Sequence, residues 1–211
     1  MPTRRTTPPG GHAAVYDAAM WPAERFAVGA WRRRLAARAH GRVLEIGAGT
    51  GSQFGWYAPG AVVTALEPDP GMAGRARRRA TLAAARVEVV EGRAERLPFP
   101  DAAFETAVSV FSLCTVDDQA AALAELRRVL VPGGTLLLLE HVHLPWQPGR
   151  ALQSIAAPAW AAVAGGCRLD RDTLSGVRAS GFAAVTAVTH VAGWVVEAEA
   201  RNPASDLRIH R

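Results

Sequence analysis

Three glycines stand close together in the segment 47–51, directly after the apolar run 43–46. A glycine has no side chain to keep a ligand away from the backbone, so a glycine loop at the end of a buried strand is a common ligand site in open α/β sheets. We therefore predict that this loop and the end of its strand bind a ligand. The predicted binding residues here are Glu45, Gly47, Ala48, Gly49 and Gly51.

A carboxylate, Glu67, closes the next apolar run, about 20 residues after Gly47, which is the spacing at which an acid accepts hydrogen bonds from ribose hydroxyls. A dinucleotide-binding loop needs G-x-G-x-x-G/A, whereas this chain has Ser52 at the last position. S-adenosylmethionine has no pyrophosphate, so its loop needs room only for a methionine moiety and a ribose. The pattern favours S-adenosylmethionine, with a nicotinamide-dependent oxidoreductase as the alternative enzyme class.

Two histidines, His141 and His143, follow the apolar run 135–139. A sulfonium methyl is already reactive, so an enzyme mainly aligns the reactants and, for a thiol or phenol acceptor, removes a proton. Histidine titrates near neutral pH and suits that task. We predict His141 as the base and His143 as an acceptor contact, while a structural role at a strand end remains the alternative.

Large aromatic residues are predicted to line the acceptor pocket, with plain core packing as an equal alternative. These residues are Tyr16, Trp146 and Trp160. Cys114 and Cys167 are too few for a disulfide framework and lack a zinc-binding spacing such as C-x-x-C, so we predict buried small side chains and no metal site. Cysteine usage predicts a reducing compartment, and we expect a bacterial, cytoplasmic protein.

The segment 1–12 carries two arginines without a following apolar stretch, so we expect a flexible leader and no signal peptide or transmembrane anchor. A net charge of +5 invites a nucleic-acid-binding alternative. All the basic residues are arginine, however, and the runs 32–34 and 75–79 suit solvated faces of amphipathic helices. We therefore expect no nucleic-acid partner, whereas peripheral membrane contact and the oligomeric state are left open.

Apolar runs of strand length alternate with helical segments along the chain. They occupy residues 43–46, 61–66, 87–90, 106–111 and 135–139, with a closing antiparallel pair at 183–188 and 191–196. This order predicts an α/β fold: a Rossmann-like, seven-stranded, mostly parallel sheet with helices on both faces and an antiparallel last strand. The pair Asp117–Asp118 and the residue Asp172 suit helix starts, and the turn 132–134 suits a helix end.

One domain suits a chain of this length. We expect it to span residues 13–200, with a helical lead-in at 13–39, an irregular aromatic insertion on the acceptor side at 141–170, and a tail at 201–211.

Four ordered motifs, 43–51, 66–69, 94–99 and 130–134, resemble those of the small class I S-adenosylmethionine-dependent methyltransferases typified by ubiquinone and menaquinone biosynthesis enzymes. The resemblance spans about residues 25 to 182. It implies that the glycines flank the methionine part, that Glu67 holds the ribose and that the 94–95 pair lies near the adenine. The cofactor contacts it adds are Pro68, Ala94, Glu95 and Ser109. Arg93 departs from the family, where aspartate is common.

A narrower resemblance covers 113–116, 140–142 and 165–173, which look like the methyltransferase-like branch whose animal members methylate small thiols. Those relatives have an N-terminal membrane anchor, which we do not expect here. Bacterial neighbours in the same group include phospholipid amine methyltransferases. The expected acceptor is therefore a small molecule with a thiol, oxygen or amine, and a phospholipid or quinone precursor is the alternative.

Overall fold

The computed structural model describes residues 28–163 and 166–204. Its centre is a seven-stranded sheet with the order β3-β2-β1-β4-β5-β7-β6, in which β7 runs antiparallel to both of its neighbours. The strands are β1 (Arg42–Ile46), β2 (Val62–Glu67), β3 (Arg86–Glu91), β4 (Phe104–Val110), β5 (Leu130–His141), β6 (Ala183–His190) and β7 (Val195–Arg201). The predicted Rossmann-like fold class is confirmed.

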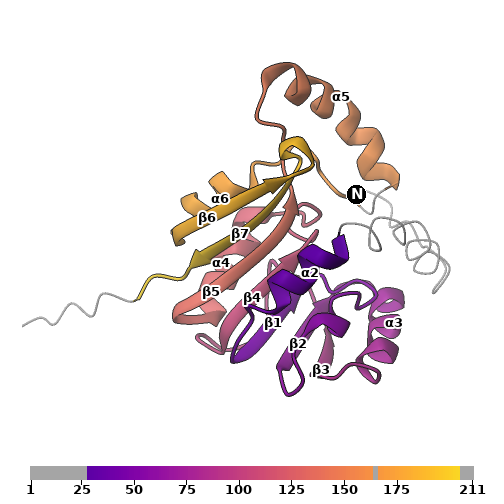
Figure 1. The fold of residues 1–211 in the computed structure, drawn as a ribbon, viewed down its shortest axis with the longest axis vertical. Helices are drawn as coiled ribbons and strands as arrows, with labels where there is room; N and C mark the ends of the chain where they lie inside the picture. The colour runs from indigo at the N-terminus through magenta and orange to yellow at the C-terminus, as the bar shows by residue number, and fades with distance from the viewer. Residues whose placement is uncertain (1–27, 164–165, 205–211) are drawn as a thin grey trace, which may run out of the picture.

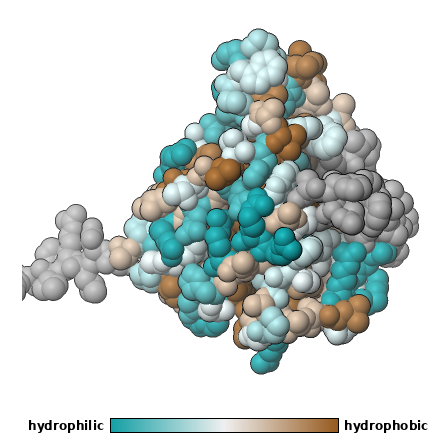
Figure 2. Space-filling model, in the orientation of Figure 1, coloured by the Kyte–Doolittle hydropathy of each residue, from teal (hydrophilic) through white to brown (hydrophobic). Residues whose placement is uncertain are grey.

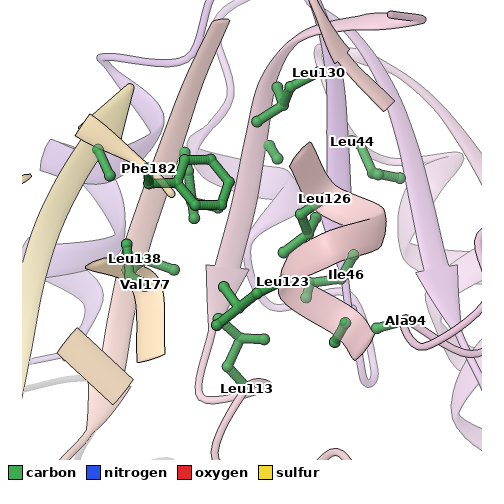
Figure 3. Packing of buried hydrophobic residues seen from close by; sticks show 14 of the residues in the cluster. Leu44, Ile46, Ala94, Leu113, Leu123, Leu126, Leu130, Leu138, Val177 and Phe182 are labelled. Atoms are coloured by element: carbon green, nitrogen blue, oxygen red, sulfur yellow. The ribbon is translucent and has the colours of Figure 1, made fainter. Parts of the chain in front are cut away.

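Helices cover both faces of this sheet (Figure 1). They are α2 (Gly29–Ala36), α3 (Pro70–Ala80), α4 (Gln119–Val129), α5 (Gln147–Val163) and α6 (Thr173–Ala179). Alternate residues of β5 belong to different cores: Leu136 and Leu138 pack with α4, whereas Leu137 and Leu139 pack on the side of α2. The α4 side is drawn in Figure 3. A strand buried on both faces needs apolar residues at consecutive positions, which is why its sequence shows a continuous run.

Aspartates begin three of the helices, as short side chains that accept from the free N–H groups of a first turn. Asp69 accepts from the Met72 backbone N–H at 2.7 Å, Asp118 from Ala121 at 3.0 Å and Asp172 from Ser175 at 3.1 Å. The helix starts predicted at Asp117–Asp118 and at Asp172 are therefore confirmed, and Asp118 is the capping residue of the first.

The segment after β5 differs from its prediction. Residues predicted as an irregular insertion form α5, a helix of 17 residues that contains Pro158. The segment is rich in alanine, the strongest helix former, and Pro148 lies in the first turn, where proline is tolerated. This helix projects from the sheet, and Figure 2 shows hydrophobic residues on it. Its exposed large apolar side chains include Leu152 and Ile155.

The last strand also differs from its prediction. Residues 191–193 form a short 3-10 turn in which Val191 and Ala192 have positive φ, and β7 begins only at Val195. The strand lies further along the chain than predicted because it includes two glutamates. Glu197 and Glu199 alternate along β7 and pair with Arg34 and Arg38, in and just after α2. The strand therefore continues through a polar stretch that the apolar pattern missed.

Beyond β7, Asn202 is buried and its amide donates to the carbonyls of Arg127, Leu130 and Val131. The packed domain thus extends past residue 200. The predicted leader, most of the lead-in and most of the tail lie outside the described residues. Within the described part of the chain, no helix is long and apolar enough to cross a membrane.

Candidate active site

The glycine loop leaves β1 at the carboxyl edge of the sheet, and all three glycines have positive φ: +60° at Gly47, +58° at Gly49 and +85° at Gly51. A side chain at Gly47 would lie 2.0 Å from the Ser112 hydroxyl, and one at Gly51 would lie 2.7 Å from the Phe54 ring. At Gly49 no atom of residues 28–163 or 166–204 is recorded within 4 Å of the same position. The outer glycines therefore allow the loop to pack, while the middle one borders open space.

Glu67 ends β2 beside this loop and is tied to it. One carboxylate oxygen accepts from the Gly49 N–H at 2.8 Å and the other from the Asp69 N–H at 2.9 Å. Burial raises the pKa of Glu67, and the two backbone hydrogen bonds oppose that change. The predicted ribose acceptor and the predicted loop are thus brought together, with the neighbouring Pro68 exposed.

Arg79 reaches back from the end of α3 to the glycine loop. One of its guanidinium nitrogens lies 2.6 Å from the Thr50 hydroxyl and 3.0 Å from the Ser52 hydroxyl. Arg32 of α2 is also buried, with its guanidinium 3.4 Å from the Gln53 side chain. The prediction that the two arginine runs form solvated faces is wrong at these positions, because one arginine of each run binds polar groups in or next to the loop.

Glu45 lies beneath the loop, fully enclosed by protein. Its carboxylate accepts a hydrogen bond from the Tyr57 hydroxyl at 2.8 Å. Burial raises its pKa to about 7, against the opposing effects of the Tyr57 hydrogen bond and the Arg32 charge. The contacts of Glu45 are with the protein, so it supports the loop from below, and its ligand contact stays a prediction.

Glu140, near the end of β5, organises the loop that follows β4. Its carboxylate accepts from the Ser109 hydroxyl at 2.6 Å. It also accepts from the backbone N–H groups of Ser112, Leu113 and Cys114 at 3.0 to 3.2 Å. Glu140 had no predicted role, although it follows an apolar run as Glu67 does, and that position was the signal for Glu67. Ser109, predicted to contact the cofactor, is buried and bound to Glu140.

The predicted adenine side lies on the loop after β3. Ala94 is buried in the core, and Glu95 accepts from the Asp117 backbone N–H at 2.8 Å. Arg93, where the resemblance expects an acid, forms ion pairs with Glu95 and Asp117. Arg93 therefore links two loops at this edge, and the adenine contacts stay predictions.

His141 ends β5 between aromatic rings and two sulfur atoms. Its ring stacks on Phe111 with centroids 4.5 Å apart. Its Nδ1 lies 3.4 Å from the Cys167 sulfur and 4.0 Å from the Cys114 sulfur, and the two sulfurs are 3.4 Å apart. The hydrogen bond shared with Cys114, aided by His141, lowers the pKa of Cys167 to about 5, and the same bond with burial raises the pKa of Cys114.

Both cysteines are buried, as predicted, but they share contacts that the sequence did not indicate. The three residues come from the loop after β4, the end of β5 and the segment after α5, so no local spacing in the chain could mark the cluster.

The other residues predicted to lie on the acceptor side have different surroundings. The His143 Nε2 lies 3.2 Å from a carboxylate oxygen of Asp172. Trp160 packs near Trp194, with ring centroids 6.2 Å apart, and Trp194 in turn lies 5.9 Å from His141. Trp146 is exposed, and Tyr16 lies outside the described residues.

Trp194 was missed by the sequence reasoning, since a lone tryptophan before a strand carries no signal. Its indole N–H is buried and has no hydrogen-bond partner among the described residues.

Comparisons with known proteins agree with this geometry. Residues 44–138 match the family described as methyltransferase domain. The chain is 33% identical to the thiol S-methyltransferase TMT1B of Rattus norvegicus over 149 residues, which is 68% of this chain and 60% of that protein. It is 39% identical to the demethylmenaquinone methyltransferase of Thermus thermophilus over 117 residues, 52% of this chain and 53% of that protein. The chain thus spans less than two thirds of either relative.

A solved structure from Thermotoga maritima, described as a SAM-dependent methyltransferase and possible histamine N-methyltransferase, has the same fold. Its TM-score is 0.68 at 24% identity, and the match covers 90% of this chain and 95% of that one. Residues 44–138 of the chain are thus similar to the methyltransferase domain family, and the chain shares its fold with this solved structure.

Proposed function

We propose that this chain is a class I methyltransferase that moves a methyl group from S-adenosylmethionine to a small thiol. The part of the proposal that concerns the methyl donor rests on the hydrogen bond from the Gly49 N–H to Glu67. This bond holds the acidic end of β2 against the glycine loop, which borders open space at Gly49. The family match over residues 44–138 supports methyl transfer rather than a nicotinamide-dependent reaction.

The residues of the loop fit this cofactor. The open space at Gly49 leaves room for a methionine moiety against the backbone. Among the described residues, each of the two Glu67 carboxylate oxygens accepts one hydrogen bond, so Glu67 keeps acceptor capacity for ribose hydroxyls. When bound, the cofactor supplies an electrophilic methyl on a sulfonium sulfur. The protein's task is then to align the acceptor with that methyl and to exclude water, an effect that can supply about 7–11 kcal/mol.

A thiol is the preferred acceptor for two reasons. The thiol S-methyltransferase relative is 33% identical, and its matched region extends over more of this chain than that of the menaquinone relative. A titratable side chain, His141, also ends β5 at the edge that carries the glycine loop. Since Nδ1 faces the Cys167 sulfur, the other ring nitrogen, Nε2, would take the proton of the acceptor thiol.

The compartment forms part of the proposal. Both cysteines are free although their sulfurs lie 3.4 Å apart, which suits a reducing cytoplasm. The sequence contains arginine but no lysine, which suits a bacterial source whose genome has a biased codon usage.

The test has two stages. Calorimetric titration with S-adenosylhomocysteine and, separately, with NADH should give binding of the first alone. Turnover with S-adenosylmethionine is then measured as S-adenosylhomocysteine release for small thiols, quinol precursors and lipids with amino headgroups. Release with thiols supports the proposal. NADH binding without S-adenosylhomocysteine binding would overturn S-adenosylmethionine as the methyl donor. S-adenosylhomocysteine release with quinols or lipids alone would overturn the thiol as the acceptor.

A further inference from the structure

Three side chains with soft or borderline metal-binding atoms meet at one point behind the carboxyl edge of the sheet. Cys114 is fully buried, Cys167 is 5% exposed and His141 is half-buried. One ligand atom from each lies within 4.8 Å of the others, and no further cysteine, histidine or acid of the described residues joins the group. The proposed base needs only His141, so the two thiols have no part in the mechanism above.

The distances between these atoms suit a shared ion. Zinc binds thiolate sulfur at about 2.3 Å and imidazole nitrogen at about 2.0–2.1 Å, in a tetrahedron. A tetrahedral centre then places two sulfurs about 3.8 Å apart and a sulfur and a nitrogen about 3.6 Å apart. The cluster has a sulfur–sulfur distance of 3.4 Å and sulfur–nitrogen distances of 3.4 and 4.0 Å. Shifts of a few tenths of an ångström would complete the geometry.

The surroundings fix the ligands in place. The Cys114 backbone N–H donates to Glu140, and its carbonyl accepts from the Arg168 N–H at 2.9 Å, so the two sulfur-bearing segments are joined. The His141 ring is held by Phe111, and Trp194 packs against the sulfur atoms' side chains. Rigid support of this kind is what a metal site requires of its neighbours. Two thiolates would also neutralise the charge of a divalent ion in this buried position.

We propose that Cys114, Cys167 and His141 form a three-ligand zinc site with one coordination position left open. Three protein ligands with an open position are typical of catalytic rather than structural zinc.

The site lies next to the donor loop, because Ser112, two residues before Cys114, is the residue against which Gly47 packs. A small thiol would bind at the open position as its thiolate and release its proton to solvent, a consequence that rests on the proposed function. Zinc at Nδ1 would leave Nε2 protonated, so the ion would replace His141 as the group that acidifies the thiol.

Zinc binding is tested on the full-length, tag-free chain, kept reduced with a phosphine and stripped of metal with a chelator. Titration against a chromophoric zinc indicator should give one ion per chain. Cys114→Ser and Cys167→Ser should each weaken binding at least about 10-fold, and His141→Ala likewise. His40→Ala is the control, since His40 lies two residues before β1 and its ring is exposed, with its Nδ1 3.2 Å from the Arg38 carbonyl oxygen. Its affinity should equal that of the wild type.

X-ray absorption spectroscopy of the zinc-loaded wild type identifies the zinc ligands directly, without relying on the folding of any variant. The expected shell is two sulfurs near 2.3 Å with one imidazole and one light-atom ligand. Absence of binding, an oxygen-only shell, or a Cys114–Cys167 disulfide that persists after phosphine treatment would each overturn the site. S-adenosylhomocysteine calorimetry of the same samples reports separately on the proposed function, because it depends on the glycine loop and not on the metal.

The open position is tested with cobalt in place of zinc. A small thiol added to the loaded protein should strengthen the thiolate-to-cobalt charge-transfer absorption. An unchanged spectrum would overturn the open position while leaving the three-ligand site intact.

Discussion

The Gly49 backbone N–H donates a 2.8 Å hydrogen bond to Glu67, which joins the glycine loop of β1 to the end of β2. The other oxygen of the same carboxylate holds the Asp69 N–H, at the start of α3. One buried acid thus orders both the loop and the helix that follows, in addition to its proposed ribose contact.

Removing this carboxylate should weaken cofactor binding. Glu67→Ala is expected to lower the affinity for S-adenosylhomocysteine about 10- to 100-fold, because hydrogen bonds to a charged group contribute about 1.5–3 kcal/mol. Calorimetry gives the value. Glu91→Ala is the matched control, since Glu91 ends the neighbouring strand in register with Glu67 but is exposed and paired with Arg77. Equal affinities in wild type and Glu67→Ala would remove Glu67 from the site.

Substitution of the middle glycine, Gly49, should affect cofactor binding much more than the stability of the fold. Gly49→Ala places a methyl group in open space at positive φ, so unfolding free energy should fall by only about 1–2 kcal/mol while S-adenosylhomocysteine binding is largely lost. Gly47→Ala should be at least about 1 kcal/mol less stable still, because its methyl would overlap the Ser112 hydroxyl. Denaturant titration and calorimetry provide the two readings. A Gly49→Ala protein that binds normally would show that the ligand lies elsewhere.

Arg79 should act on the cofactor through the loop. Arg79→Ala removes its hydrogen bonds to Thr50 and Ser52, and we expect the affinity for S-adenosylhomocysteine to fall about 3- to 10-fold, which is about 1 kcal/mol. Arg78→Ala removes the same charge from an exposed neighbour and should bind as the wild type does. A similar loss in both variants would indicate a general charge effect instead of loop ordering.

Glu45 should make the protein less stable as the pH rises. Its pKa is about 7 in the folded chain against an ordinary 4.5, so the native state binds the extra proton between those values and stability falls across that window, by about 3 kcal/mol in total. Glu45→Gln removes this loss. Relative to wild type, it should gain about 2–3 kcal/mol of unfolding free energy between pH 5 and pH 8.

Urea unfolding at the two pH values measures that gain. Glu88→Gln, at an exposed position of β3, serves as the control and should show no such difference. A pH-independent effect of Glu45→Gln would mean that Glu45 is ionised throughout.

His141 should affect turnover and leave cofactor binding alone. His141→Ala is expected to reduce the kcat for thiol methylation about 100-fold or more, whether the ring acts as base or as metal ligand. The affinity for S-adenosylhomocysteine should stay within about 2-fold, because the ring contacts Phe111 and the two sulfurs rather than the glycine loop. Parallel losses of binding and turnover would point to a structural histidine. His40→Ala should change neither quantity.

Local patterns in the sequence were enough to predict the fold class, which is confirmed, and the glycine loop next to Glu67. Five continuous apolar runs identified the parallel strands, and three glycines at fixed spacing with an acid after the next run located the loop. Aspartates marked two helix starts. These signals are local, because a strand buried on both faces, a backbone at positive φ and a helix cap each impose a requirement on neighbouring residues.

The neighbours of His141 follow from contacts between segments that are distant in the sequence. Cys114, Cys167 and His141 are brought together from three segments by the order of the strands, and nothing in their spacing indicates it. The roles of Arg79 and Glu140 likewise depend on which loop lies within reach of a long or buried side chain. The α5 helix and the full length of β7 were missed because propensity and ion pairs, rather than hydrophobic periodicity, stabilise them. Contacts between distant segments are set by packing, and packing is a property of the whole fold.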